Sequence, residues 1–121
     1  MIKHKIGLHG MEFFAFHGLH PEETTNGNKF IVDVEVETDF TKAALSDDIS
    51  GTFDYEQIYA IVEQEMKITS KLLEHLAERI LMKLKLFPAT AFSIKVSVAK
   101  MNPPLKGVTA KSFIEICYKK K

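Results

Sequence analysis

The stretch KFIVDVEVETDF, residues 29–40, alternates apolar and charged residues with a period of two. Successive side chains of a strand point to opposite faces, so this pattern predicts a β-strand with one face buried and one in water. The expected inward-facing set is Phe30, Val32, Val34, Val36 and Phe40, and the outward-facing set is Asp33, Glu35, Glu37 and Asp39. A sheet packed on one face against a hydrophobic layer is therefore the starting point for the fold.

The segment before this strand, about residues 3–16, predicts a second strand. Its alternation is interrupted around Gly10, where a bulge or bend is expected. The side chains expected on one face are Ile6, Leu8, Phe14 and Phe16. The intervening stretch HGLHPEETTNGNK is polar and rich in turn formers, so the two strands should form a hairpin with a long loop.

Residues 55–66 change to a helical period, and Asp54 followed by Gln57 resembles a capping box at the start of this helix. The apolar stripe comprises Tyr55, Ile58, Tyr59, Val62 and Met66. A second helix is expected from about Lys71 to Leu86, ended by Pro88. Its stripe comprises Leu72, Leu73, Leu76, Ile80 and Leu84.

Two further strands follow the helices. The first of them is expected to turn Phe92, Ile94, Val96 and Val98 inward. The last strand, over about residues 111–119, carries Ile114, Ile116 and Tyr118 on one face. The order ββααββ predicts a single α+β domain over residues 1–121, with a four-stranded antiparallel sheet covered on one face by two helices. A ferredoxin-like βαββαβ order is the alternative, but two consecutive helices argue against it. The open sheet edges favour closure by further copies of the chain.

The composition narrows the classes of partner and compartment. Sixteen basic residues balance sixteen acidic ones, so no net field favours nucleic acid or an anionic membrane. A single cysteine, Cys117, allows no internal disulfide and favours a reducing compartment. The N-terminus lacks the pattern of a signal peptide, and no stretch approaches the roughly 20 apolar residues that cross a bilayer. We therefore expect a cytoplasmic protein.

Lys100 is the first candidate for chemistry, because it ends a well-patterned strand in the stretch VAKMNPP, residues 98–104. A solvated lysine at a sheet rim is the simpler interpretation. Each proline fixes φ, however, and the residue before a proline is restricted as well. The backbone after Lys100 should therefore be rigid, which suits an amine that must hold its position.

Glu74 and Tyr55 are candidates at helix starts. Glu74 lies at the margin of its apolar stripe, where a carboxylate interacts favourably with the helix dipole. It can also accept two parallel N–H bonds from a guanidine-like edge of a ligand. Tyr55 follows SGTFD at the start of the first helix, where most tyrosines serve for packing.

The loop HGLHPEE offers His17, His20, Glu22 and Glu23. The H-x-x-H spacing raises the question of a metal, but no third histidine follows at a usual spacing. His9 or His75 would have to reach the loop through the fold. We expect no metal and no cofactor, and a set of groups for acid–base chemistry instead.

Four motifs together identify a family. They are FHG (16–18) followed by Glu23, SDDISGTFDY (46–55), LLEHLAERI (72–80) and KMNPP (100–104). In this order and spacing, over nearly the whole chain, they resemble the dihydroneopterin aldolases of folate biosynthesis. The resemblance implies the tunnelling fold, in which subunits join into ring-shaped barrels. It also implies two stacked tetramers forming an octamer, with sites at subunit interfaces.

The resemblance implies a carbon–carbon lyase that cleaves 7,8-dihydroneopterin into 6-hydroxymethyl-7,8-dihydropterin and glycolaldehyde. Glu74, helped by the backbone of Leu73, corresponds to the group that binds the pterin ring. Lys100 corresponds to the main acid–base residue, and Glu23 to the loop acid that contacts the substrate side chain and the lysine. Tyr55 corresponds to the tyrosine that assists protonation of the enol intermediate. Glu22 next to Glu23 leaves the identity of the loop acid dependent on spacing.

Three alternatives differ in chemistry. An epimerase would act on dihydroneopterin, or on its triphosphate with Lys106 and Lys111 as the cationic candidates. A zinc-dependent pterin enzyme would use the histidines near residues 17–20. A non-catalytic pterin-binding assembly protein would keep Glu74 alone, and the presence of Lys100, Tyr55 and a loop acid argues against it.

Overall fold

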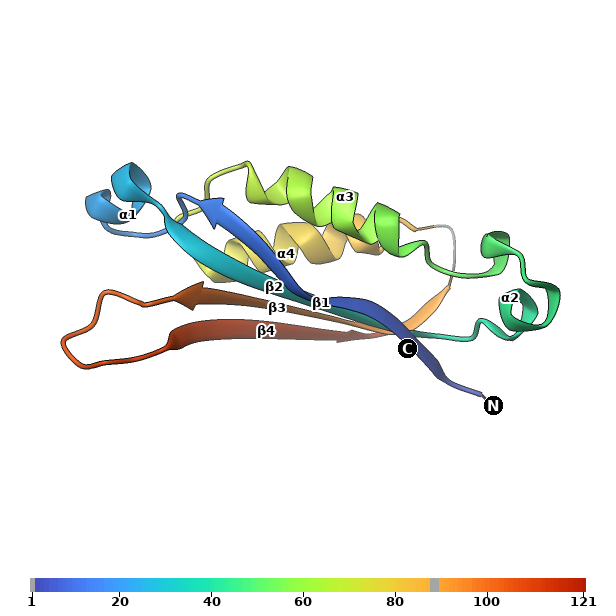
Figure 1. The fold of residues 1–121 in the computed structure, drawn as a ribbon. Coiled ribbons are helices and arrows are strands. Elements are labelled where there is room, and N and C mark those ends of the chain that lie inside the picture. The colour runs from blue at the N-terminus through green and yellow to red at the C-terminus, as the bar shows by residue number, and fades with distance from the viewer. Residues whose placement is uncertain (1, 88–89) are drawn as a thin grey trace.

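The computed structural model describes residues 2–87 and 90–121. Four strands form one antiparallel sheet in the order β1-β2-β3-β4. Helices α3 and α4 lie together over one face of this sheet (Figure 1). The strands are β1 (His4–Ala15), β2 (Asn28–Thr38), β3 (Ala91–Met101) and β4 (Lys111–Lys119), and the two long helices are α3 (Tyr55–Met66) and α4 (Leu73–Leu84). The predicted α+β class and ββααββ order are confirmed.

The predicted bulge in β1 is present, but its effect on the strand was misjudged. The register shifts between Leu8 and Met11, so two residues of β1 stand opposite one residue of β2. Gly10 adopts φ +74° there, and its N–H donates to Asp33 at 2.6 Å. The inward-facing set beyond the bulge is Met11, Phe13 and Ala15.

The prediction that Phe14 and Phe16 share a face with Ile6 and Leu8 is therefore wrong. Phe14 is 66% exposed and Phe16 is 40% exposed. The extra residue at the bulge exchanges the two faces of the strand, because side chains alternate at every residue. Two aromatic rings are thus left outside the core.

The core lies between the sheet and the two long helices. Its fully buried side chains include Phe30, Val32, Val34, Val36, Ile58, Val62, Leu76, Ile80, Leu84, Val96 and Val98. Phe40 is not part of the inward series, because β2 ends at Thr38, whose hydroxyl donates to the Thr90 carbonyl at 2.5 Å. Phe40 stacks instead on His4, with ring centroids 3.9 Å apart.

The long helices match their predicted positions with small differences at the ends. Asp54 caps α3, but its side chain accepts from the N–H of Glu56 at 2.9 Å and forms no box with Gln57. Helix α4 begins at Leu73, two residues later than predicted, and ends at Leu84. Pro88, the predicted terminator, lies outside the described residues.

Two short helices and a 3₁₀ turn were not predicted. They are α1 (Pro21–Asn26), inside the predicted hairpin loop, and α2 (Thr41–Ser46) with η1 (Ile49–Gly51) before α3. Helix α1, the start of α4 and the β3–β4 turn gather at one end of the sheet, and α2 and the start of α3 lie at the other end (Figure 1). No helix in residues 2–87 or 90–121 is long and apolar enough to span a membrane.

Candidate active site

Lys100 continues the inward-facing series of β3 after Val96 and Val98, opposite Phe30 in β2. Its amine forms a hydrogen-bonded ion pair with the Glu23 carboxylate, and only 13% and 11% of the two side chains are exposed. An inward-facing lysine would be costly without such a partner. The strand pattern thus places an amine at the edge of the core and pairs it there with an acid.

The backbone just beyond Lys100 is held by hydrogen bonds at Met101 and Asn102. Asn102 adopts φ +46°, and its N–H donates to the Ala110 carbonyl at 2.9 Å. Asn28 donates from its side chain to the Met101 carbonyl at 2.7 Å, which joins β2 to the end of β3. Lys100 is therefore fixed from both sides.

Glu23, and not its neighbour Glu22, reaches Lys100. Helix α1 turns Glu22 into solvent and Glu23 toward the sheet, where its carboxylate also accepts from the His20 N–H at 3.3 Å. Gly18 makes room for this carboxyl group, since a Cβ at that position would come within 2.5 Å of its Cδ. Burial raises the pKa of Glu23, but the hydrogen bonds from Lys100 and from the His20 N–H, together with the charge of Lys100, outweigh it and lower the pKa.

One cleft, here called the Lys100 cleft, brings together Glu23, Leu73, Glu74 and Lys100. It has a volume of about 290 Å³, and Pro103 and Pro104 form part of its wall. The N-cap residue of α4 is Leu72, so no side chain caps this helix start. The first-turn N–H groups and the Glu74 carboxylate can therefore bind a flat ligand edge that offers both donors and acceptors.

Tyr55 does not join this cleft within one chain. It begins α3 at the opposite end of the sheet from α1 and the start of α4 (Figure 1), and it is 57% exposed. The structure thus brings together four of the five predicted site residues. A tyrosine in this cleft would have to come from another copy.

The two loop histidines have different surroundings. His17 is 1% exposed, and its Nδ1 accepts from the Ser70 N–H at 3.0 Å. His20 is exposed and immediately precedes α1. Within the described ranges, no group of three His, Cys, Asp or Glu residues is placed to hold a metal ion. The Nδ1 atom of His17 thus serves as an acceptor for the backbone.

We expect the pH dependence of stability to depend on His17. Burial, then the charge of Arg79, lowers its pKa from 6.5 to about 4, against a smaller opposite effect from the Met66 carbonyl. The unfolded chain therefore binds a proton at higher pH than the folded chain, and stability falls as the pH drops from 6.5 to 4. The loss across this window should be roughly 3 kcal/mol. Urea unfolding at several pH values measures it, and a His17→Asn variant with the same slope as the parent would contradict it.

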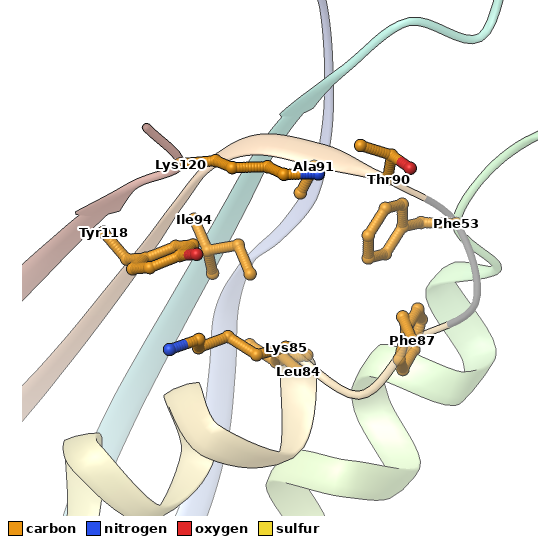
Figure 2. Close-up of a pocket in the computed structure, with 9 residues that line it drawn as sticks. All are labelled: Phe53, Leu84, Lys85, Phe87, Thr90, Ala91, Ile94, Tyr118 and Lys120. Carbon is orange, nitrogen blue, oxygen red and sulfur yellow. The ribbon is translucent and has the colours of Figure 1, made fainter.

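A second cavity, of about 220 Å³ (Figure 2), lies beside the start of β3, whereas Lys100 is near the end of that strand. The stacked rings of Phe53 and Phe87 form one side, and Lys85 extends over the ring of Tyr118, with 4.3 Å from Nζ to the ring centroid. None of the residues that line it carries a carboxylate. It therefore lacks the paired acid and base of the Lys100 cleft.

The chain was compared with protein-family models, with known sequences and with solved structures. A family model described as "FolB: Dihydroneopterin aldolase" matches residues 6–117. The chain belongs to the dihydroneopterin aldolase family. The *Bacillus subtilis* dihydroneopterin aldolase is 36% identical over 121 residues, with 96% of this chain and 98% of that protein covered.

Solved structures of dihydroneopterin aldolases share the fold. The *Escherichia coli* enzyme, in complex with neopterin, gives a TM-score of 0.79 at 22% identity, covering 93% of this chain and 98% of that one. The *Burkholderia* enzyme bound to guanine gives 0.74 at 17% identity, covering 98% and 93%. The predicted tunnelling fold of this family is confirmed at the level of the subunit.

The sequence predicted four residues that line the Lys100 cleft, but it missed the buried polar residues behind them. Ser70, Arg79 and Glu65 hold the segment before α4 through hydrogen bonds with His17 and with one another. The sequence signals were His17, which was considered there only as a metal ligand, and Arg79, which lies in the motif LLEHLAERI and was not singled out.

Proposed function

We propose that this chain is a dihydroneopterin aldolase, which cleaves 7,8-dihydroneopterin into 6-hydroxymethyl-7,8-dihydropterin and glycolaldehyde. The observation that carries this proposal is the Lys100–Glu23 ion pair in the same cleft as the Glu74 carboxylate. Membership of the family supports it. So do the relatives bound to neopterin and guanine, because both ligands present an amine beside a ring N–H.

Glu74 binds the pterin ring in this proposal. Its carboxylate accepts from the 2-amino group and the N3–H, while the backbone of Leu73 holds the adjacent edge of the ring. Two parallel charge-assisted hydrogen bonds fix both position and orientation. The substrate side chain then extends toward Lys100 and Glu23, which lie across the same cleft.

The cleavage requires a base for the 2′-hydroxyl proton and an acceptor for the electrons of the C1′–C2′ bond. The N5=C6 imine of the pterin accepts those electrons, so the protein needs to supply only positioned proton transfer. Lys100, with Glu23, handles the proton at the hydroxyl and at N5. A proton delivered to C1′ then completes the hydroxymethyl product, and Tyr55 assists that step. Re-addition of glycolaldehyde with inversion at C2′ would give epimerase activity with the same groups.

Tyr55 reaches the Lys100 cleft from another copy of the chain in this proposal. Its place at the far end of the subunit supports an assembly in which sites form between copies. β1 and β4 are edge strands, and their backbone groups can pair with a neighbour to close a ring. The proposed assembly is an octamer of two stacked tetramers, built from one domain spanning residues 1–121. A reducing cytoplasm suits its exposed free thiol, Cys117.

Mixed oligomers test the shared site. We expect Tyr55→Phe and Lys100→Ala, each assembled alone, to lose about 10²-fold or more of the turnover. Co-assembled, the two variants should regain activity, because about a quarter of randomly paired sites would combine an intact tyrosine with an intact lysine. Tyr59→Phe, on the same helix and 40% exposed, is the matched control. Mixtures no more active than their components would refute a site shared between copies.

Incubation with 7,8-dihydroneopterin, followed by chromatography of the products, tests the reaction itself. Equimolar 6-hydroxymethyl-7,8-dihydropterin and glycolaldehyde are expected. An epimer without glycolaldehyde would identify an epimerase instead, and unchanged substrate would leave a binding protein. Elemental analysis of the same sample addresses the zinc alternative, since stoichiometric zinc would favour it.

A further inference from the structure

His17 joins two segments that are far apart in the sequence. The Ser70 N–H donates to His17 Nδ1 at 3.0 Å, and the Gly18 N–H donates to the Ser70 carbonyl at 3.0 Å. Both histidine and serine are buried, at 1% and 5% exposed. This reciprocal pair of hydrogen bonds ties the β1–α1 segment to the α3–α4 segment.

Arg79 holds the same α3–α4 segment from the other side. Its guanidinium donates to the carbonyl and carboxylate of Glu65 at 3.1 and 2.6 Å, to the Ile68 carbonyl at 2.8 Å and to Ser70 Oγ at 2.8 Å. Glu65 is itself only 7% exposed. Four bonds from one rigid, planar group fix the path of the chain from the end of α3 to Ser70.

Both joined segments lead directly into the Lys100 cleft. Glu23 follows Gly18 through helix α1, and Leu73 and Glu74 follow Ser70. His17 also packs edge-to-face against Phe30, with centroids 5.2 Å apart, and Phe30 is the strand partner of Lys100. The histidine therefore lies where the supports of the proposed acid–base pair and of the proposed pterin anchor meet.

We propose that His17, Ser70 and Arg79 form a clasp that sets the position of Glu74 relative to the Lys100–Glu23 pair. They are positioning residues, since they act through groups that contact the substrate. This inference rests on the proposed function. The contrasting interpretation is that His17 only fills space in the core. The two interpretations predict opposite orders of kcat/KM for the variants His17→Phe and His17→Asn.

His17→Phe and His17→Asn separate ring volume from the hydrogen bond. Phenylalanine keeps the ring against Phe30 but has no acceptor for the Ser70 N–H. Asparagine loses the ring but can place Oδ1 where Nδ1 accepts that bond. Nε2 meets no hydrogen-bond partner at full bonding geometry within the described part of the chain, so asparagine gives up only the weak influence of the Met66 carbonyl there. Core filling favours phenylalanine, whereas the clasp favours asparagine.

The test measures kcat/KM for 7,8-dihydroneopterin at a temperature well below the thermal midpoints of all variants. His17→Phe should lose about tenfold or more, because an unsatisfied buried N–H lets the segment shift and small displacements are costly to catalysis. His17→Asn should stay within about threefold of the parent even if its thermal midpoint is lower. Activity that follows the thermal midpoint, or a His17→Phe variant as active as the parent, overturns the clasp.

A second variant covers the case in which His17→Phe does not fold. Ser70→Ala keeps the backbone bond to His17 and removes only the Oγ that accepts from Arg79, so about fivefold should be lost in kcat/KM. Unchanged kinetics would overturn the clasp. If the parent itself releases no glycolaldehyde, the proposed function fails. The dissociation constant of neopterin, measured for the same variants, then tests the clasp alone. His17→Phe should bind neopterin more weakly than His17→Asn, and equal dissociation constants would overturn the clasp.

Discussion

Replacing Lys100 by alanine should lower the rate of glycolaldehyde release by about 10²–10⁴-fold, the range typical of a removed general acid–base group. The KM for 7,8-dihydroneopterin should change little, because in the proposed binding mode Glu74, and not the amine, binds the pterin ring. Lys100 is the penultimate residue of β3 and lies in the cleft beside the Glu23 carboxylate. Its loss therefore removes the proposed proton-transferring group and leaves Leu73 and Glu74 in place. Steady-state measurement of glycolaldehyde separates the two parameters.

Two controls support this prediction. Lys95 lies on the same strand but on the other face of the sheet, where its amine is 3.7 Å from the Glu35 carboxylate. The variant Lys95→Ala should therefore retain the parent's turnover. Because Lys100→Ala leaves the mostly buried Glu23 without its partner, the thermal midpoint must be measured as well, and Glu23→Gln combined with Lys100→Ala relieves that unpaired charge. A folded Lys100→Ala protein with full turnover would show that the acid–base assignment is wrong.

Replacing Glu74 by alanine should weaken the binding of neopterin by about 100-fold or more, since two hydrogen bonds to a charged group are lost together. The stability of the fold should hardly change, because Glu74 is exposed and forms no ion pair within the described residues. Calorimetric titration with neopterin gives the dissociation constant directly.

Glu78→Ala is the matched control for this substitution. It removes an exposed glutamate one turn further along α4, outside the residues that line the cleft. Its affinity for neopterin should equal that of the parent. Equal losses in the two variants would mean that the glutamates act through the general charge of the helix and that Glu74 is not the anchor.

Elements with a strong period could be predicted from the sequence, and short elements could not. The alternation in β2 buries Phe30, Val32, Val34 and Val36 as predicted. In the predicted stripe of α3, Ile58, Val62 and Met66 are buried, whereas Tyr55 and Tyr59 are exposed. Helix α1 buries no residue, and its sequence, Pro21–Asn26, has the composition of a loop. Helix α1 is stabilised by local turns and by the contact of Glu23 with Lys100. Neither of these produces a periodic pattern of apolar residues in the sequence.

The faces of β1 illustrate a second limit. A bulge near Gly10 could be inferred, but the sequence does not say how many residues it adds. One extra residue moves Phe14 from the expected core face to the outside, because the period of a strand is two. A correct element with a misjudged register thus produced a wrong assignment of buried residues.

The candidate site was predictable where its residues belong to motifs. Lys100 and Glu74 stand in KMNPP and LLEHLAERI, and the structure places both in one cleft. The choice between Glu22 and Glu23 needed the direction in which α1 turns. The clasp around His17 depends on contacts between segments 53 residues apart, which no local pattern records. In the proposed site, Tyr55 comes from a second copy of the chain, which the sequence of one chain does not reveal.

A crystal structure of the assembled protein with neopterin bound would test the central claim most directly, since that claim is that the pterin binds in the Lys100 cleft. The 2-amino edge of the pterin should lie on the Glu74 carboxylate, with the side-chain hydroxyls beside the amine of Lys100 and a tyrosine from a second copy completing the site. A pterin bound instead in the cavity lined by Phe53 and Tyr118, or far from Lys100 in every copy, would contradict the account.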